Sequence, residues 1–160
     1  MRYMEVVRTR AHGKINLGLD VLRKREDGYH EVRTIMQRVG LYDGIEIQCL
    51  GNLGAMRHIG IETNLKYLPA NENNLAYRAA ELLMDEFGIT ESIHIKIRKM
   101  IPVAAGMGGG SADAAAVLKG INRMFDLHLT EAELMERSIK LGADVPYCVM
   151  GGTALAEGIG

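Results

Sequence analysis

A glycine-rich segment in the second half of the chain has the composition of an anion-binding loop. It runs from Pro102 to Ser111, contains Gly106 and a run of glycines at 108–110, and lies between an expected strand and an expected helix. Glycines let backbone N–H groups turn toward an anion because no β-carbon stands in the way. The helix N-terminus adds unpaired N–H donors and the positive end of its dipole. We therefore expect this segment to bind a phosphate group.

The details of the segment exclude the two most familiar nucleotide loops. No Lys-Ser/Thr pair follows the glycines, so the segment is not a Walker A motif, and the third glycine of a dinucleotide fingerprint would fall at Ser111. The Ser111 hydroxyl can cap the helix, or it can reach a phosphate oxygen or a bound metal ion. An ordinary glycine-rich turn stays open as the alternative, although ordering three consecutive glycines costs conformational entropy.

Several segments together resemble one enzyme family. The glycine segment, with Asp113 behind it, is similar to the phosphate-binding motif of the GHMP kinases, which include galactose, homoserine and mevalonate kinases. The segments at 11–17, 25–30, 73–79 and 141–146 are similar to the branch of that family that phosphorylates CDP-methylerythritol. The resemblance spans essentially all 160 residues. Gly13 departs from it, because the family commonly has alanine before the lysine, but Lys14 itself stays in place.

The resemblance implies that Lys14 and Asp144 are the catalytic pair. Asp144 would accept the proton of the substrate hydroxyl or orient that hydroxyl, and Lys14 would stabilise the charge on Asp144 and on the transferring phosphoryl group. Taken alone, Lys14 is interpreted as an ordinary solvated strand residue. Taken alone, Asp144 is interpreted as a turn residue after a helix, with Val145 held extended before Pro146.

The resemblance also implies the ligands and their contacts. ATP and Mg²⁺ are expected, with Ser111 as the expected metal ligand and Asp113 as a second candidate. CDP-methylerythritol is the expected substrate: Asn16 would contact it, Tyr29 would stack on its cytosine and His30 would hydrogen-bond the same ring. By local chemistry, residues 27–30 also fit a surface hairpin turn. The residues expected to contact ATP are Asn74 (locally also a helix N-cap), Pro102, Ala104, Ala105, Gly106, Met107, Gly108, Gly109, Gly110, Ser111 and Ala112.

The strands that position these residues follow from hydrophobic alternation. Strands are predicted at 15–21, 45–49 and 93–98, and the stretch 31–38 is expected to be extended. In the first of them Lys14 and Asn16 would share one face. The opposite, apolar face would consist of Ile15, Leu17, Leu19 and Val21.

Helices are predicted in three places. The first runs from Asn74 to Phe87, the second from Ser111 to Met124, and the third from Thr130, which opens a capping box, to Leu141. A last strand is expected just before Ala154. The order of strands, helix, strand, two helices and strand indicates an α+β fold.

The composition narrows the class of protein further. Hydrophobic residues make up 48% of the chain and charged residues 24%, and the net charge of −1 disfavours a nucleic-acid partner. Cys49 and Cys148 lack zinc-ligand spacing and fit reduced thiols. We expect a cytoplasmic protein, because the sequence has neither a signal-peptide core nor an apolar run of about 20 residues. Lys96, Arg98 and Lys99 are interpreted as a solvated face.

These expectations combine into one prediction with two rivals. The fold is predicted to be the GHMP kinase N-terminal domain (ribosomal protein S5 domain 2-like), with a mixed, mostly antiparallel sheet and helices on one face. We expect this domain to span 1–160, a C-terminal GHMP domain to be absent from the chain, and the chain alone to have little or no kinase activity. Its apolar surface would favour a homodimer. The rivals are another GHMP kinase, of the homoserine or mevalonate type, and a non-catalytic nucleotide- or RNA-binding module.

Overall fold

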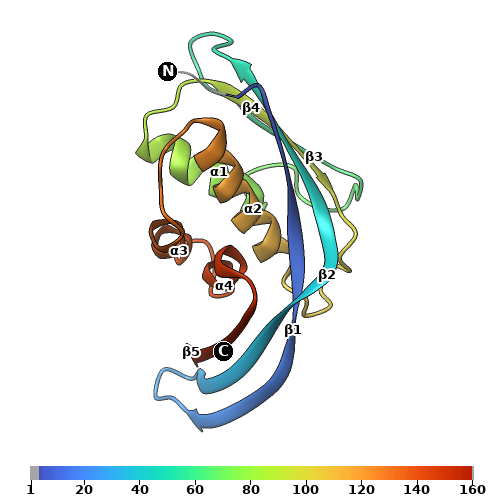
Figure 1. Ribbon diagram of the computed structural model, residues 1–160, viewed down its shortest axis with the longest axis vertical. Coiled ribbons are helices and arrows are strands. Elements are labelled where there is room, and N and C mark those ends of the chain that lie inside the picture. Colours follow the sequence, from blue (N-terminus) through green and yellow to red (C-terminus); the bar gives the residue numbers. More distant parts are fainter. Residues whose placement is uncertain (1–3, 160) are drawn as a thin grey trace.

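The fold is α+β, as predicted, with a curved sheet and a layer of helices. The computed structural model describes residues 4–159. In that part of the chain the strands are β1 (Val6–Lys24), β2 (His30–Gly51), β3 (Ile59–Thr63), β4 (Ser92–Arg98) and β5 (Thr153–Ile159). The helices are α1 (Leu75–Glu86), α2 (Gly109–Met124), α3 (Glu131–Ser138) and α4 (Val145–Met150). All of these helices lie on one side of the sheet, which confirms the predicted arrangement (Figure 1).

The sheet is mixed and mostly antiparallel, which was also predicted. Its strand order is β1-β2-β4-β3, and β5 pairs with β2. Only the pairing of β3 with β4 is parallel among the described strands. The sequence did not predict β3, which is short and follows a loop.

β1 and β2 form a hairpin that is longer than predicted. The segments expected at 31–38 and 45–49 are parts of one strand, β2, because different partners extend it at its two ends. β4 pairs with its 44–51 half, and β5 pairs with its 31–37 half. The outer half of the hairpin leaves the helical layer as a curved arm, with β5 against it (Figure 1).

The core lies between the sheet and the two longest helices. Ile93, Ile95 and Ile97 are almost fully buried, which confirms the predicted alternation of β4. Against them pack the alanine-rich faces of α1 and α2, whose small side chains let the helices approach closely. At Gly120 an added β-carbon would lie 2.5 Å from Cδ1 of Ile47, so this glycine is where α2 comes nearest to β2.

Helix ends agree with the sequence where a capping side chain defines them. Asn74 caps α1 by accepting a hydrogen bond from the N–H of Ala76, and Thr130 forms the predicted capping box with Glu133. α2 starts earlier than predicted, at Gly109, with Gly108 as its N-cap. Ser111 therefore lies inside the first turn, and the interpretation of Ser111 as the cap is wrong.

The expectation that Val145 is held extended before Pro146 is wrong. Val145 is the first residue of α4 and Pro146 the second. Proline is tolerated in the first turn of a helix because the N–H that it lacks has no intrahelical acceptor there. Asp144 is the N-cap residue of this helix, although its side chain makes no capping hydrogen bond.

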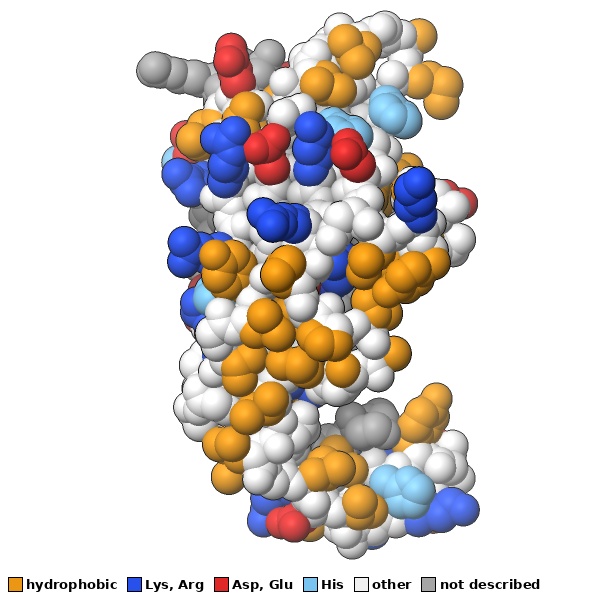
Figure 2. Space-filling model, turned by 90° about the vertical axis from the view of Figure 1, so that its right-hand side faces the viewer, with side chains coloured by type: hydrophobic (Ala, Val, Ile, Leu, Met, Phe, Trp, Pro, Cys, Tyr) orange, Lys and Arg blue, Asp and Glu red, His pale blue; other side chains and the backbone are white. Residues whose placement is uncertain are grey.

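The apolar face predicted for the first strand does not join the core. Ile15 is 38% exposed, and Leu17, Leu19 and Val21 are 58–60% exposed, because they lie on the arm, where no helix covers the sheet. Figure 2 looks onto the sheet face that lies away from the helices and shows hydrophobic side chains gathered across its middle. An exposed apolar surface of this kind is typical of an interaction surface.

Candidate functional site

The glycine-rich segment forms a tight loop between β4 and α2. Backbone φ is positive at Ala104 (58°), Gly106 (72°) and Gly108 (65°), and residues with positive φ turn successive N–H groups toward one side. Because Gly108 caps α2 without a side chain, no capping group covers the first turn of the helix. The N–H of Ala112 is bonded to the carbonyl of Gly108 and is therefore not free for a ligand.

A hollow of about 340 Å³ lies beside this loop. It is lined by residues 102–110, by the segment from Leu68 to Leu75 that contains Asn74, and by Lys99 and Asp113. The amide of Asn74 is already used: its Oδ1 accepts from Ala76 and its Nδ2 donates to the carbonyl of Pro69 at 2.9 Å. Most of the predicted ATP residues thus line one cavity, in which Asn74 acts first as a helix cap, whereas Ser111 and Ala112 are not among its lining residues.

Lys14 and Asp144 meet directly beside the loop. The Lys14 Nζ is 3.7 Å from Oδ2 of Asp144. The backbone N–H of Lys14 donates to the carbonyl of Met107 at 2.9 Å, and a β-carbon at Gly108 would lie 3.2 Å from Cε of Lys14. Lys14 is only 6% exposed, so the interpretation of it as a solvated strand residue is wrong. Strand β1, the loop and the start of α4 therefore bring a cation, a carboxylate and the glycine-rich backbone turn together.

A short hydrogen-bond chain holds the Lys14 side chain in place. Its Nζ donates to Oδ1 of Asn16 at 2.7 Å, and Nδ2 of Asn16 donates to Oγ1 of Thr34 at 2.7 Å. The Thr34 hydroxyl in turn donates to the carbonyl of Gly18 at 2.8 Å. The Lys14–Asn16 contact places both side chains on the same face of β1, as expected. Gly13 leaves room for the alanine common in the family, because the nearest atom to an added β-carbon is 3.4 Å away.

The sequence analysis missed a buried ionic cluster under the loop. Lys99 is 8% exposed, and its Nζ donates to Oδ2 of Asp43 at 2.5 Å and to Oδ2 of Asp113 at 2.8 Å. The prediction that Lys99 belongs to a solvated face is therefore wrong, whereas Lys96 and Arg98 are exposed. A signal was present: Lys99 continues the inward-facing series of Ile95 and Ile97.

The cluster ties the loop to the sheet. Oδ1 of Asp43 accepts hydrogen bonds from the N–H groups of Met100 at 2.6 Å and Ile101 at 2.8 Å, where the chain leaves β4. A β-carbon at Gly109 would lie 3.1 Å from Nζ of Lys99, so the ammonium group sits against the first residue of α2. Burial raises the pKa of Asp113 to about 8; the Lys99 ammonium opposes this rise, and Asp43 adds to it.

Ser111 and Asp113 were the expected metal ligands. The described residues contain no group of three or more His, Cys, Asp or Glu side chains that could hold a metal ion. The Asp113 carboxylate contacts the Lys99 ammonium through Oδ2, and its Oδ1 is buried without a hydrogen-bond partner in the described structure. The Ser111 hydroxyl lies in the first turn of α2, next to the loop.

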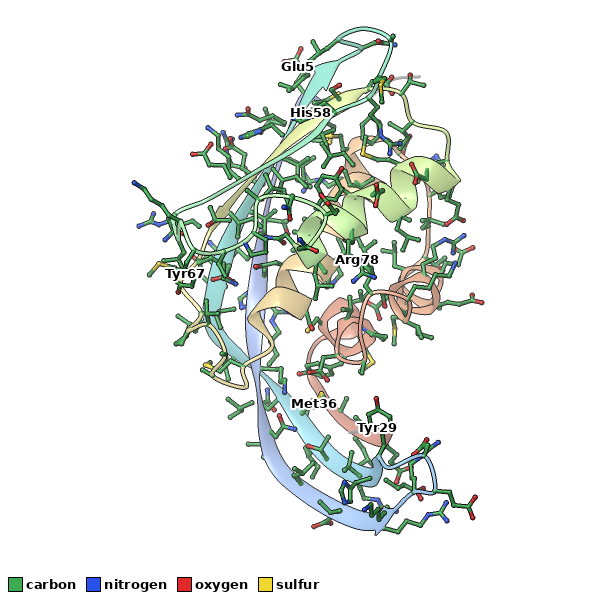
Figure 3. All side chains as sticks on the ribbon, turned by 180° about the vertical axis from the view of Figure 1, so that it is seen from behind. Glu5, Tyr29, Met36, His58, Tyr67 and Arg78 are labelled. Atoms are coloured by element: carbon green, nitrogen blue, oxygen red, sulfur yellow. The ribbon has the colours of Figure 1, made fainter. Side chains whose placement is uncertain are left out.

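Tyr29 and His30 lie at the far end of the arm (Figure 3). Both are exposed, and in the described residues no contact joins them to Lys14, Asp144 or the loop. The N–H of Tyr29 donates to Oδ1 of Asp27 at 3.1 Å, so the local turn chemistry is present as well. A ligand that touched both Tyr29 and Asp144 would have to extend along the arm.

The described helices include none that is long and apolar enough to cross a membrane.

Fold and site agree with one family of small-molecule kinases. The family model described as GHMP kinases N terminal domain matches residues 74–152, from the cap of α1 to the end of α4. The chain belongs to this family and folds as its N-terminal domain.

The similarity extends to one kind of kinase within the family. A relative from Lachnospira eligens, named 4-diphosphocytidyl-2-C-methyl-D-erythritol kinase, is 52% identical over 157 residues, which are 98% of this chain and 53% of the relative. A crystal structure of 4-(cytidine 5'-diphospho)-2C-methyl-D-erythritol kinase matches with a TM-score of 0.80 and 35% identity, over 95% of this chain and 52% of that one. The chain spans about half the length of these proteins.

More distant structures share the fold. Homoserine kinase from Cytophaga hutchinsonii matches with a TM-score of 0.74 over 99% of this chain and 52% of that one. Its identity is 16%, so this likeness concerns the fold alone.

Proposed function

We propose that this chain is the ATP-binding domain of a kinase that phosphorylates the 2-hydroxyl group of 4-diphosphocytidyl-2-C-methyl-D-erythritol. This reaction belongs to the non-mevalonate route to isoprenoid precursors. The observation that carries the proposal is the 3.7 Å contact between Lys14 Nζ and Asp144 Oδ2 beside the glycine loop. The relatives at about 50% identity, which carry this kinase's name, support the choice of substrate.

The geometry suits phosphoryl transfer. N–H groups of residues 106–111 would hold the phosphates of ATP, with the first turn of α2 adding its positive dipole end. Asp144, whose side chain is 37% exposed, would accept the proton from the acceptor hydroxyl. The oxygen then bonds to the γ-phosphorus as the bond to ADP breaks, and Lys14 would stabilise the charge that develops on the phosphoryl oxygens.

Mg²⁺ would be held mainly by oxygen atoms of ATP, and the chain would contribute few ligands. Mg²⁺ is usually held by one or two protein ligands together with phosphate oxygens and water. Ser111 would supply the single hydroxyl ligand, and the ion would neutralise charge on the phosphates when bound. Lys99 already provides a fixed positive charge beneath the loop.

The central test is an assay of the full-length protein with ATP and CDP-methylerythritol, with the phosphorylated product identified by mass spectrometry. Asp144→Asn keeps the shape of the side chain and removes the base, so we expect the rate to fall by about 10²–10⁴ with little change in thermal stability. Full activity in this variant would remove Asp144 from the proposed role.

The substrate is tested separately at the tip of the arm. Tyr29→Ala should abolish binding of CDP-methylerythritol and leave ATP binding intact, because Tyr29 is far from the loop. A kinase of the homoserine or mevalonate type would be insensitive to this change. An RNA-binding module would instead show RNA affinity that falls steeply with salt and does not depend on Lys14 or Asp144.

We propose two properties of the isolated chain. It should show little or no turnover, because about half of each relative lies outside the match. The exposed side chains Leu17, Leu19 and Val21 should favour a homodimer. Normal turnover by the 160-residue chain contradicts the first statement, and a monomer at all concentrations in sedimentation contradicts the second.

A further inference from the structure

A second cavity lies next to the glycine loop, between β1, α2 and α4, and has a distinct chemistry. Its volume is about 390 Å³, and it is open to solvent, because the Arg38 and Lys119 side chains at its rim are exposed. The space exists because the residues at its floor are small: Ala11 and Gly13 on β1, Ala112 on α2 and Gly151 after α4.

Two positively charged side chains, Arg38 on β2 and Lys119 on α2, line this cavity, and no Asp or Glu is among the lining residues. Arg10 lines it from β1, but its side chain turns to Tyr42 on the sheet face that lies away from the helices. Arg38 is the cross-strand partner of Lys14, and its side chain lies 3.6 Å from the position of a β-carbon at Gly151. The charge of Arg38 also acts on both His12 and Tyr147, two further lining residues.

These cations differ from most other arginines of the described chain. Arg8, Arg23, Arg25, Arg33, Arg57 and Arg137 each pair with a carboxylate. Arg38 and Lys119 have no side-chain hydrogen bond or ion pair within residues 4–159, and Arg10 only stacks on Tyr42, with Cζ 4.8 Å from the ring centroid. Arg38 and Lys119 are like charges beside one hollow, and a bound anion would relieve their repulsion.

We propose that this cavity is a binding site for a diphosphate group. Two adjacent positive charges match a diphosphate better than a monocarboxylate, and the Arg38 guanidinium supplies planar donors suited to phosphate oxygens. His12 adds an uncharged ring: burial, together with the charges of Arg38 and Arg10, lowers the pKa of His12. Arg38, Lys119 and His12 have no part in the proposed kinase machinery, so the site can exist whether or not the chain is a kinase.

Residue-specific labelling separates this cavity from the glycine loop, which also attracts anions. The 160-residue chain is treated with phenylglyoxal, with and without inorganic pyrophosphate, and arginine modification is read by peptide mass spectrometry. We expect pyrophosphate to protect Arg38 and to leave Arg98, an exposed arginine on β4, unprotected. Acetate, a monoanion, should protect neither residue. Equal labelling of Arg38 with and without pyrophosphate overturns the proposal. This is also the result expected if pyrophosphate binds only at the glycine loop.

Calorimetric titration with pyrophosphate gives a second, independent reading. Arg38→Gln and Lys119→Gln should each weaken binding by about tenfold or more, the usual effect of losing one hydrogen bond to a charged group. Arg98→Gln is the matched control and should leave the affinity unchanged. Unchanged affinity in both cavity variants contradicts the site.

The source of the diphosphate is decided by comparing two probes. Protection of Arg38 by cytidine diphosphate at lower concentration than by pyrophosphate assigns the site to a nucleotide. Protection at equal concentrations assigns it to the free inorganic anion.

Discussion

The buried cluster beneath the glycine loop predicts that Lys99 is among the most sensitive residues of the chain. Lys99→Met keeps the length of the side chain and removes its charge, which leaves the carboxyl groups of Asp43 and Asp113 buried without their shared cation. The charge that remains is that of Asp43, which keeps two backbone N–H donors, whereas Asp113, with a pKa of about 8, is largely protonated at neutral pH and keeps only Asp43 as a partner.

The expected loss of stability in Lys99→Met follows from this difference between the two aspartates. Removing one partner of a buried ion pair costs about 3–5 kcal/mol, because the remaining charge is uncompensated. For a chain of this size that corresponds to a fall in Tm of about 6–20 °C. Urea denaturation followed by far-UV circular dichroism would measure the free energy of unfolding directly.

Two further variants make the test specific. Lys96→Met, on the exposed side of the same strand, should change the free energy of unfolding by no more than about 0.5 kcal/mol. Adding Asp113→Leu to Lys99→Met should recover part of the stability, because it removes a buried carboxyl group that has lost its partner Lys99. A loss below about 1 kcal/mol for Lys99→Met, or no recovery in the double variant, would refute the reasoning.

Three other outcomes are expected. Gly108→Ala should lower the free energy of unfolding, measured by urea denaturation, by about 1–2 kcal/mol, because φ is +65° and the new β-carbon would lie 3.2 Å from Lys14. Gly18→Ala, with open space around the new β-carbon, is the control and should be nearly neutral. Asn74→Ala should lower the free energy of unfolding by about 1 kcal/mol, because α1 loses its capping side chain. The same urea denaturation measures this change, and an unchanged free energy of unfolding would mean that solvent replaces the cap. Burial raises the pKa of Cys148 to about 12, so its thiol stays protonated and should react slowly with iodoacetamide at pH 8 until the chain is unfolded in urea. Because the unfolded thiol ionises near the usual cysteine pKa of 9.0, this group's contribution to the free energy of unfolding should fall as pH rises from there toward 12. Equal labelling in folded and unfolded protein would contradict the burial.

The local features of this protein could be read from its sequence because short-range chemistry determines them. Asn74 and Thr130 cap helices through their own side chains, and the alternation of Ile93, Ile95 and Ile97 reflects the pleat of one strand. The glycine loop, too, was recognisable, since its backbone needs glycine at positive φ.

Other features were decided only by tertiary contacts. β2 is a single long strand because β4 and β5 pair with different halves of it, and the two partners are far away in the chain. The apolar residues of the arm stay exposed because no helix reaches that part of the sheet, which alternation along one strand cannot reveal.

The candidate site also combines features that the sequence predicts with features that only tertiary contacts decide. The sequence pointed to the glycine loop through its local chemistry, and to Lys14 and Asp144 through its resemblance to the kinase family. Only the tertiary structure decided that Lys14 and Asp144 lie 3.7 Å apart, and that Lys99 turns inward to Asp43 and Asp113 instead of outward to solvent. The physical reason is that burial and ion pairing depend on segments that are distant in the chain, and no local pattern encodes their distance.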